Sequence, residues 1–259
     1  MIGEVFIYIS LFVVGLALGS FYNVLIYRLP RNISIVYPPS HCPHCKQKIK
    51  WYDNIPLVSF FLLKGKCRYC GEKISIRYPL IEFSSGLLAV LSYYKWGFTL
   101  EAFFYYFFFS ALLVISLIDW FHFIIPPQIS IGGIIISLAL SPFRRDISPL
   151  ESLIGLGVGI TIPLLIYLYY VKIRKVEGLG LGDVILLGFI GSATGIYGVF
   201  SALFIGSFIG LVYVIPLVIK HRSFGFAVPF GPFLSLGAFI GILLKEEILS
   251  YLGYTNIVI

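Results

Sequence analysis

The sequence predicts an all-α, polytopic membrane protein with about eight transmembrane helices and a small cytoplasmic zinc-binding loop. The chain of 259 residues is 59% hydrophobic and only 12% charged, and its mean hydropathy is +0.96. Soluble domains carry about 25% charged residues, so this composition does not fit a soluble fold. The apolar runs are continuous and lack the period-2 alternation of barrel strands, which argues against a transmembrane barrel.

Eight apolar segments are each close to the length that a membrane crossing requires, which is about 20 residues. The first has no basic stretch before it and is too long for a signal peptide, so we expect it to remain as a span. The sixth and seventh meet in a very short turn between Gly195 and Gly198. The segments are 5–27, 79–95, 101–118, 123–141, 151–171, 181–196, 199–219 and 227–244.

The distribution of basic residues predicts the orientation in the membrane. Ten of the 19 Lys and Arg residues lie between Arg28 and Arg77, against two acidic residues. Basic loops stay in the cytoplasm, where they face anionic lipid, so the N-terminus is expected outside. Arg144 and Arg145 then fall outside, against the rule.

The loop has no nucleic-acid-binding signature, so no nucleic-acid partner is expected. Three parts follow: a first transmembrane helix (1–29), the cytoplasmic loop (30–78) and a membrane domain of about seven helices (79–259).

Asp119 and Asp183 are ionisable residues in or beside apolar segments. Placing a carboxylate at membrane depth costs at least ~2.5 kcal/mol, so each is a candidate functional residue. The predicted topology brings both to the cytoplasmic face, because Asp119 ends the third span and Asp183 begins the sixth. Peptide hydrolysis needs a base that activates water and an acid that protonates the leaving nitrogen, and two close carboxylates supply both. The pair therefore indicates an aspartic peptidase working in the membrane.

Glycine and proline residues flank the two aspartates. Gly180 and Gly182 precede Asp183 and are expected to shape the site, since glycine allows close backbone approach and non-helical angles. Irregular backbone at membrane depth is tolerated where it lines a cavity, and a substrate helix must be unwound before it is cut. Pro126 and Pro127 follow Asp119 and are expected to break the next helix near the membrane surface.

All four cysteines lie in the basic loop as two Cys-x-x-Cys pairs separated by 21 residues. This spacing can place four thiolates around one Zn²⁺, and disulfides are disfavoured in a reducing cytoplasm. A polar loop of about 50 residues needs such a staple, so the zinc is expected to be structural. His41 and His44 are expected to be bystanders. The predicted ligands are Cys42, Cys45, Cys67 and Cys70.

Two further polar residues, Asn23 and Glu82, lie in or at apolar spans. They are either interhelical hydrogen-bond partners or the lining of a second site.

Two other functions remain open for the whole chain. A proton-coupled transporter would use the aspartates as a relay and should show broken helices in two matching halves, and no such repeat is present. A non-enzymatic assembly factor built on the zinc loop would tolerate loss of both aspartates.

Four motifs in order resemble the type IV prepilin peptidases, a family of GxGD membrane aspartic proteases. The resemblance extends from about residue 15 to residue 191, and the last two spans are only generically similar. The motifs are 15–30 (GLALGSFYNVLIYRLP), 40–82 with its cysteine pairs, Asp119 with Pro126, and 177–183 (EGLGLGD). Phe121, Pro127, Val184 and Ile185 depart from the family pattern, which bears on substrate contacts rather than on the aspartates.

The resemblance implies that Asp119 and Asp183 are the catalytic pair and that prepilins or pseudopilins of pilus and type II secretion machinery are cut. It implies a multi-pass protein of the bacterial inner membrane with its active site facing the cytoplasm. Family members that contain the cysteine loop tend also to methylate the new amino-terminus with S-adenosylmethionine. No GxGxxG pattern for that cofactor is present, so its site is unknown. A peptidase without methyltransferase activity is the alternative.

Overall fold

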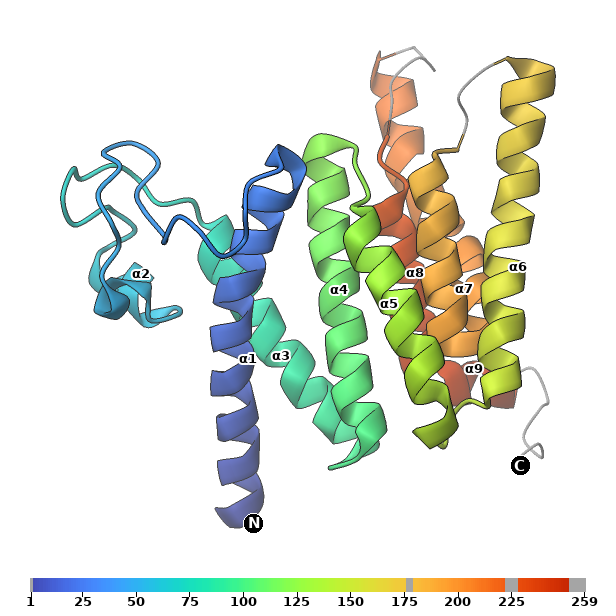
Figure 1. The fold of residues 1–259 in the computed structure, drawn as a ribbon, viewed down its shortest axis with the longest axis horizontal. Coiled ribbons are helices and arrows are strands. Elements are labelled where there is room, and N and C mark those ends of the chain that lie inside the picture. Colours follow the sequence, from blue (N-terminus) through green and yellow to red (C-terminus); the bar gives the residue numbers. More distant parts are fainter. Residues whose placement is uncertain (1, 176–178, 222–227, 252–259) are drawn as a thin grey trace. The chain divides into compact units, whose positions relative to one another are not determined.

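The computed structural model describes residues 2–175, 179–221 and 228–251, and within these ranges the regular structure is helical (Figure 1). The only β-type pairing among them is two isolated bridges in the loop, His41 with Lys48 and Lys66 with Lys73. The long helices are α1 (Ile2–Arg28), α3 (Arg77–Trp96), α4 (Leu100–His122), α5 (Pro127–Leu140), α6 (Pro149–Leu168), α7 (Leu181–His221) and α8 (Gly231–Leu243). The short ones are η1 (Leu29–Arg31), η2 (Trp51–Asn54), α2 (Val58–Leu62), η3 (Ser141–Phe143), η4 (Tyr169–Arg174) and α9 (Lys245–Tyr251).

The predicted class, an all-α polytopic membrane protein, is confirmed. In the described ranges, four helical stretches are long and apolar enough to cross a membrane. They are Gly3–Arg31, Leu100–His122, Pro149–Arg174 and Leu181–Lys220, and two shorter apolar helices lie at Pro127–Phe143 and Gly231–Leu243. Helix α3 occupies the predicted second span. The predicted start of the last span at 227 lies outside the described residues.

Helix α7 contains both the sixth and the seventh predicted spans. Gly195 interrupts it with φ 70° and ψ −169°, a conformation that glycine adopts without steric penalty. The predicted turn near this residue is therefore a sharp kink rather than a loop, and α7 consists of two helical halves.

The chain divides into two compact units, one ending at Ser110 and the other beginning at Ala111, so α4 contributes to both. In the first unit, α1 packs closely on α3. A Cβ atom added at Gly15 would lie 2.8 Å from the Cα of Gly86, and one added at Gly19 would lie 2.6 Å from the Cα of Glu82. Gly15 and Gly19 are one helical turn apart, the small-residue spacing that lets membrane helices approach.

The second unit contains the last part of α4 together with α5 to α9. Helices α6 and α7 lie side by side in it (Figure 1), with the backbones of Gly155 and Gly191 in close contact. Beside this contact, the kink at Gly195 interrupts the hydrogen bonding of the first half of α7. Carbonyl groups at a helix end need donors from elsewhere.

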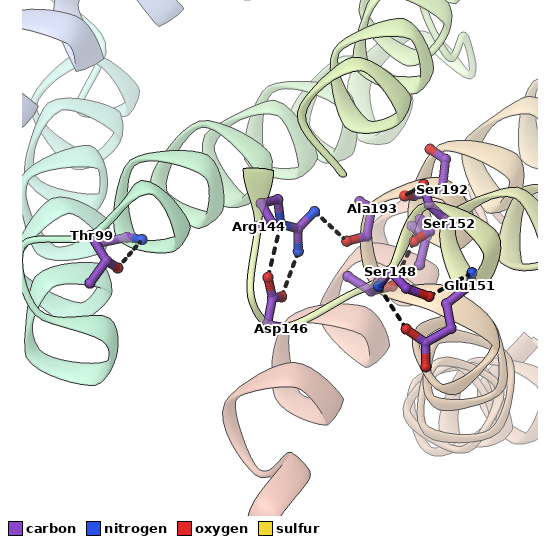
Figure 2. A network of polar contacts seen from close by, with 11 residues as sticks. Thr99, Arg144, Asp146, Ser148, Glu151, Ser152, Ser192 and Ala193 are labelled. Atoms are coloured by element: carbon purple, nitrogen blue, oxygen red, sulfur yellow. Dashed lines mark hydrogen bonds and ion pairs between the residues drawn. The ribbon is translucent and has the colours of Figure 1, made fainter. Parts of the chain in front are cut away.

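Arg144 and Ser152 supply those donors (Figure 2). Arg144 is buried, its Nη1 donates to the carbonyl of Ala193 at 2.9 Å, and its Nε and Nη2 donate to the Asp146 carboxylate at 3.0 and 2.6 Å. The Ser152 hydroxyl donates to the carbonyl of Ser192 at 2.6 Å. Arg144, which the charge rule leaves on the unexpected side of the membrane, therefore has a structural role at the kink.

Replacing Arg144 should destabilise the second unit, whereas replacing the adjacent exposed Arg145 should not. Arg144→Ala leaves the Ala193 carbonyl and the Asp146 carboxylate without their buried donor, which costs about 3 kcal/mol for a pair of this kind. We expect a lower melting temperature in detergent for Arg144→Ala and a nearly unchanged one for Arg145→Ala. Equal melting temperatures for the two variants would show that the network does not hold the kink.

Candidate active site and thiol cluster

Asp119 lies in the last turn of α4 and is only 6% exposed. Helix α4 ends at His122 because Phe123 adopts a positive φ of 55°. The Phe123 N–H donates to the Asp119 carbonyl at 2.8 Å. The Asp119 side chain is held by a different segment: its Oδ2 accepts the backbone N–H of Gly231 at 2.9 Å. Gly231 begins α8, so the carboxylate occupies a helix N-terminus, where backbone donors favour a negative charge.

Asp183 lies in the first turn of α7 and is 8% exposed. Its Oδ2 accepts the backbone N–H of Gly180 at 3.0 Å, and its own N–H donates to the Gly180 carbonyl at 3.1 Å. Its Oδ1 is buried and has no hydrogen-bond partner in the described part of the chain. A buried acceptor without a partner is rare in a folded protein and indicates a place where water or a ligand binds.

The two aspartates converge in the second unit, as the sequence predicted. Ile125 connects their surroundings, since a Cβ atom at Gly182 would lie 2.9 Å from its Cβ and one at Gly231 would lie 3.2 Å from its Cδ1. The end of α4, the segment before α5, and the starts of α7 and α8 therefore meet at one place.

The structure gives the predicted glycines specific positions. Gly180 precedes α7 and supplies the donor to Asp183, while Gly182 lies within the helix and leaves room for Ile125. Neither has a positive φ, so both serve close approach rather than an unusual backbone angle. Glu177 and Gly178, the first residues of the same motif, lie outside the described residues.

Gly231 was not predicted as a site residue. A Cβ atom there would lie 2.7 Å from the Oδ2 of Asp119, so only glycine leaves the carboxylate in place. The available signal was the Gly231-Pro232 pair, which is typical of a helix start with exposed N–H groups. That signal does not reveal that the N–H binds a carboxylate 112 residues earlier.

The four cysteines lie together in the first unit, and their Sγ atoms are all within 4.8 Å of one another. Both pairs form the same turn: the Cys42 and Cys67 N–H groups donate to Gln47 and Glu72, and the Lys46 and Gly71 N–H groups donate back to the two cysteines. No disulfide joins these cysteines. The Cys42 and Cys70 sulfurs are 3.8 Å apart. Tetrahedral Zn²⁺ with bonds of about 2.3 Å separates its sulfur ligands by about 3.8 Å, so the cluster is compatible with zinc.

The electrostatics of the cluster also suit a cation. Backbone N–H groups of Cys70 and Tyr69 lower the pKa of Cys67 to about 7. Although the Glu72 N–H favours the Cys70 thiolate, desolvation and the sulfurs of Cys67, Cys45 and Cys42 raise the pKa of Cys70 to about 12. Thiolates this close repel one another unless a metal ion lies between them.

The loop is joined to the membrane helices by polar side chains. Asn23 donates to the carbonyls of Gly19 and Tyr78 at 3.3 and 3.1 Å, so it links α1 to α3. Glu82 accepts the backbone N–H of Leu57 at 2.8 Å. Arg28 is buried and donates to the carbonyls of Ser34 and Pro38 at the start of the loop.

The cavity of the first unit does not suit S-adenosylmethionine. A cavity of about 110 Å³ lies among α1, α3 and the first part of α4, and its lining is almost wholly apolar, including Leu18, Ala89 and Phe103. A zwitterionic cofactor with an adenine ring needs polar partners that this lining lacks.

These features define a class: a polytopic membrane protein with a buried carboxylate pair held at two helix starts and a thiol cluster outside the spans. Residues 13–96 match the bacterial Peptidase A24 N-terminal domain, and residues 106–215 match the type IV leader peptidase family. The chain belongs to the type IV leader peptidase family.

Curated relatives agree with this assignment over most of their length. The chain is 30% identical to a prepilin leader peptidase/N-methyltransferase of Pseudomonas putida, covering 91% of this chain and 90% of the relative. It is 36% identical to a type 4 prepilin-like proteins leader peptide-processing enzyme of Escherichia coli, covering 89% and 91%. A prepilin leader peptidase/N-methyltransferase of Bacillus subtilis is 32% identical, covering 93% and 96%. No solved structure matches the chain.

Proposed function

We propose that this protein is an aspartic endopeptidase that cleaves the leader peptide of type IV prepilins or pseudopilins and then methylates the new amino-terminus. The observation that carries the peptidase is the pair of buried carboxylates. Each has one oxygen held by a backbone N–H, and the second oxygen of Asp183 has no partner among the described residues. That arrangement fixes both side chains while leaving an acceptor for water.

The proposed reaction needs one proton held between the two aspartates. The ionised carboxylate accepts a proton from water, and the water oxygen attacks the scissile carbonyl. The protonated carboxyl group donates its proton to the leaving nitrogen, so the C–N bond breaks into a carboxylate and an amine. The hydrogen bonds from Gly231 and Gly180 keep the carboxylates in place through both steps.

The four clustered cysteines support a structural zinc ion and the two-activity type of enzyme. Zinc would hold the two turns of the loop together, and bound S-adenosylmethionine would supply the methyl group. The ten basic residues between Arg28 and Arg77 favour the cytoplasmic side of a bacterial inner membrane, and pilus or type II secretion machinery would be the destination of the products. The proposal keeps the division into helix 1–29, zinc loop 30–78 and peptidase domain 79–259.

Replacing either aspartate should abolish cleavage without disturbing the fold. Asp119→Asn and Asp183→Asn keep the side-chain size but remove proton transfer, and we expect each to lower the cleavage rate by about 10³-fold or more. A purified pilin-type substrate and mass analysis of the products give the measurement. Unchanged membrane insertion and melting temperature serve as the control, and near-normal cleavage by either variant would refute the pair.

The methyl transfer is tested with the same substrate. Incubation with S-adenosylmethionine should add about 14 Da to the processed product and nothing to the uncut precursor. Cleavage without this increment would leave a peptidase alone.

Gly231→Ala should impair cleavage even though the substitution is small. The added Cβ displaces the Asp119 carboxylate, and a shift of about 1 Å in a catalytic group can lower the rate by about 10²-fold. Gly157→Ala is the control, because an added Cβ there has no neighbour within 4 Å. If the two variants cleave equally well, the hydrogen bond from Gly231 does not position the catalytic carboxylate.

The zinc assignment predicts about one zinc ion per chain, measured by elemental analysis of the purified protein. Cys42→Ser should lose the metal, because a four-thiolate shell with one ligand missing binds far more weakly. His44→Ala should keep it, since His44 lies outside the thiol cluster. Metal-free wild-type protein, or metal retained by Cys42→Ser, would contradict the assignment.

A further inference from the structure

The zinc loop contains a strained turn directly before α2. Leu57 has φ 58° and ψ −52°, and the Val58 N–H donates to the Pro56 carbonyl at 2.6 Å. A hydrogen bond across three residues with a positive central φ is a γ-turn of the rare, unfavourable kind. A branched residue such as leucine adopts this conformation only where its surroundings hold it there.

The Glu82 carboxylate is the group that holds the turn. Its Oε2 accepts the Leu57 N–H at 2.8 Å. Glu82 is only 8% exposed, and a buried carboxylate is unfavourable unless it is hydrogen-bonded. It lies where α1 and α3 approach most closely, because the Cα of Glu82 faces Gly19. The anchor point is therefore fixed by two packed helices.

Further hydrogen bonds connect this γ-turn to the second cysteine pair. Ser59, two residues after Leu57, is buried; its hydroxyl donates to the carbonyl of Tyr52 and accepts the N–H of Ile55. These bonds fix η2, which carries Asp53. The Asp53 carboxylate accepts three hydrogen bonds from Arg68, with distances between 2.6 and 3.0 Å.

Arg68 follows Cys67 directly and lies within the second Cys-x-x-Cys pair. Hydrogen bonds joined by short stretches of backbone therefore connect the α1–α3 contact, through Glu82 and the γ-turn, to the second cysteine pair. All of these contacts lie within the first unit. Because the aspartate pair lies in the second unit, these contacts do not include the peptidase site.

We propose that Glu82 is a positioning residue that orients the zinc loop on α1 and α3 and thereby supports methyl transfer but not peptide cleavage. This inference rests on the proposed methyl transfer. The feature that matters is a hydrogen-bond acceptor for Leu57, not a negative charge. Glutamine can supply that acceptor through its side-chain amide oxygen.

The test compares Glu82→Ala with Glu82→Gln in the full-length protein. Hydrogen exchange of the peptide that contains the Leu57 amide should be at least about 10-fold faster in Glu82→Ala, and close to wild type in Glu82→Gln. The methylation rate should fall about 10-fold or more in Glu82→Ala and recover in Glu82→Gln. Cleavage should stay within about twofold in both. Val36→Ala, a change at an exposed residue of the same loop away from the cysteine pairs, should change none of these values.

Two results would overturn the inference. If Glu82→Gln loses methylation as Glu82→Ala does, the negative charge is required and the positioning role is wrong. If Glu82→Ala changes neither exchange nor methylation, the hydrogen bond does not position the loop. Should the wild-type protein cleave without methylating, that part of the proposed function fails. The exchange of the Leu57 amide then still decides whether Glu82 holds the loop.

Discussion

A backbone N–H at the start of a helix holds each of the two buried carboxylates, and the rest of the candidate site depends on this. Gly231 binds Asp119 and Gly180 binds Asp183, at 2.9 and 3.0 Å. Helix starts present unpaired N–H groups and a partial positive charge, so they stabilise anions in an apolar setting without a neighbouring cation. A lysine or arginine would stabilise the carboxylates too, but it would oppose the protonation of either one.

Small residues make this arrangement possible in both units. Gly182 and Gly231 let Ile125 and Asp119 approach helix backbones in the second unit, and Gly19 brings α1 against Glu82 in the first. At Gly231 and Gly19 a side chain would displace Asp119 or Glu82, whereas at Gly182 it would displace Ile125. Gly195 has a different role, because its positive φ breaks α7 and a buried arginine supplies the missing donor. Glycine therefore serves this fold in two ways, by leaving room at close contacts and by adopting the backbone angles of the kink.

Much of this was predictable from sequence because it depends on local pattern. The lengths of the apolar segments predict the helices, and the positions of Asp119 and Asp183 in the sequence predict that they lie at helix ends. The spacing of the four cysteines predicts that they form one cluster. Gly231 was missed, because the choice of which helix start binds a carboxylate is made by tertiary packing. For Glu82 the sequence allows either an interhelical hydrogen bond or a second site. Its partner is the Leu57 N–H of the zinc loop, a contact that no periodicity reveals.

The most direct test of the carboxylate pair follows oxygen during a single round of cleavage in ¹⁸O-labelled water. If Asp119 and Asp183 activate a water molecule, one labelled oxygen enters the new carboxylate of the released leader, and the enzyme remains unlabelled. Labelled oxygen in the peptide that contains Asp119 or Asp183 would instead reveal a covalent acyl intermediate and would contradict the proposed mechanism.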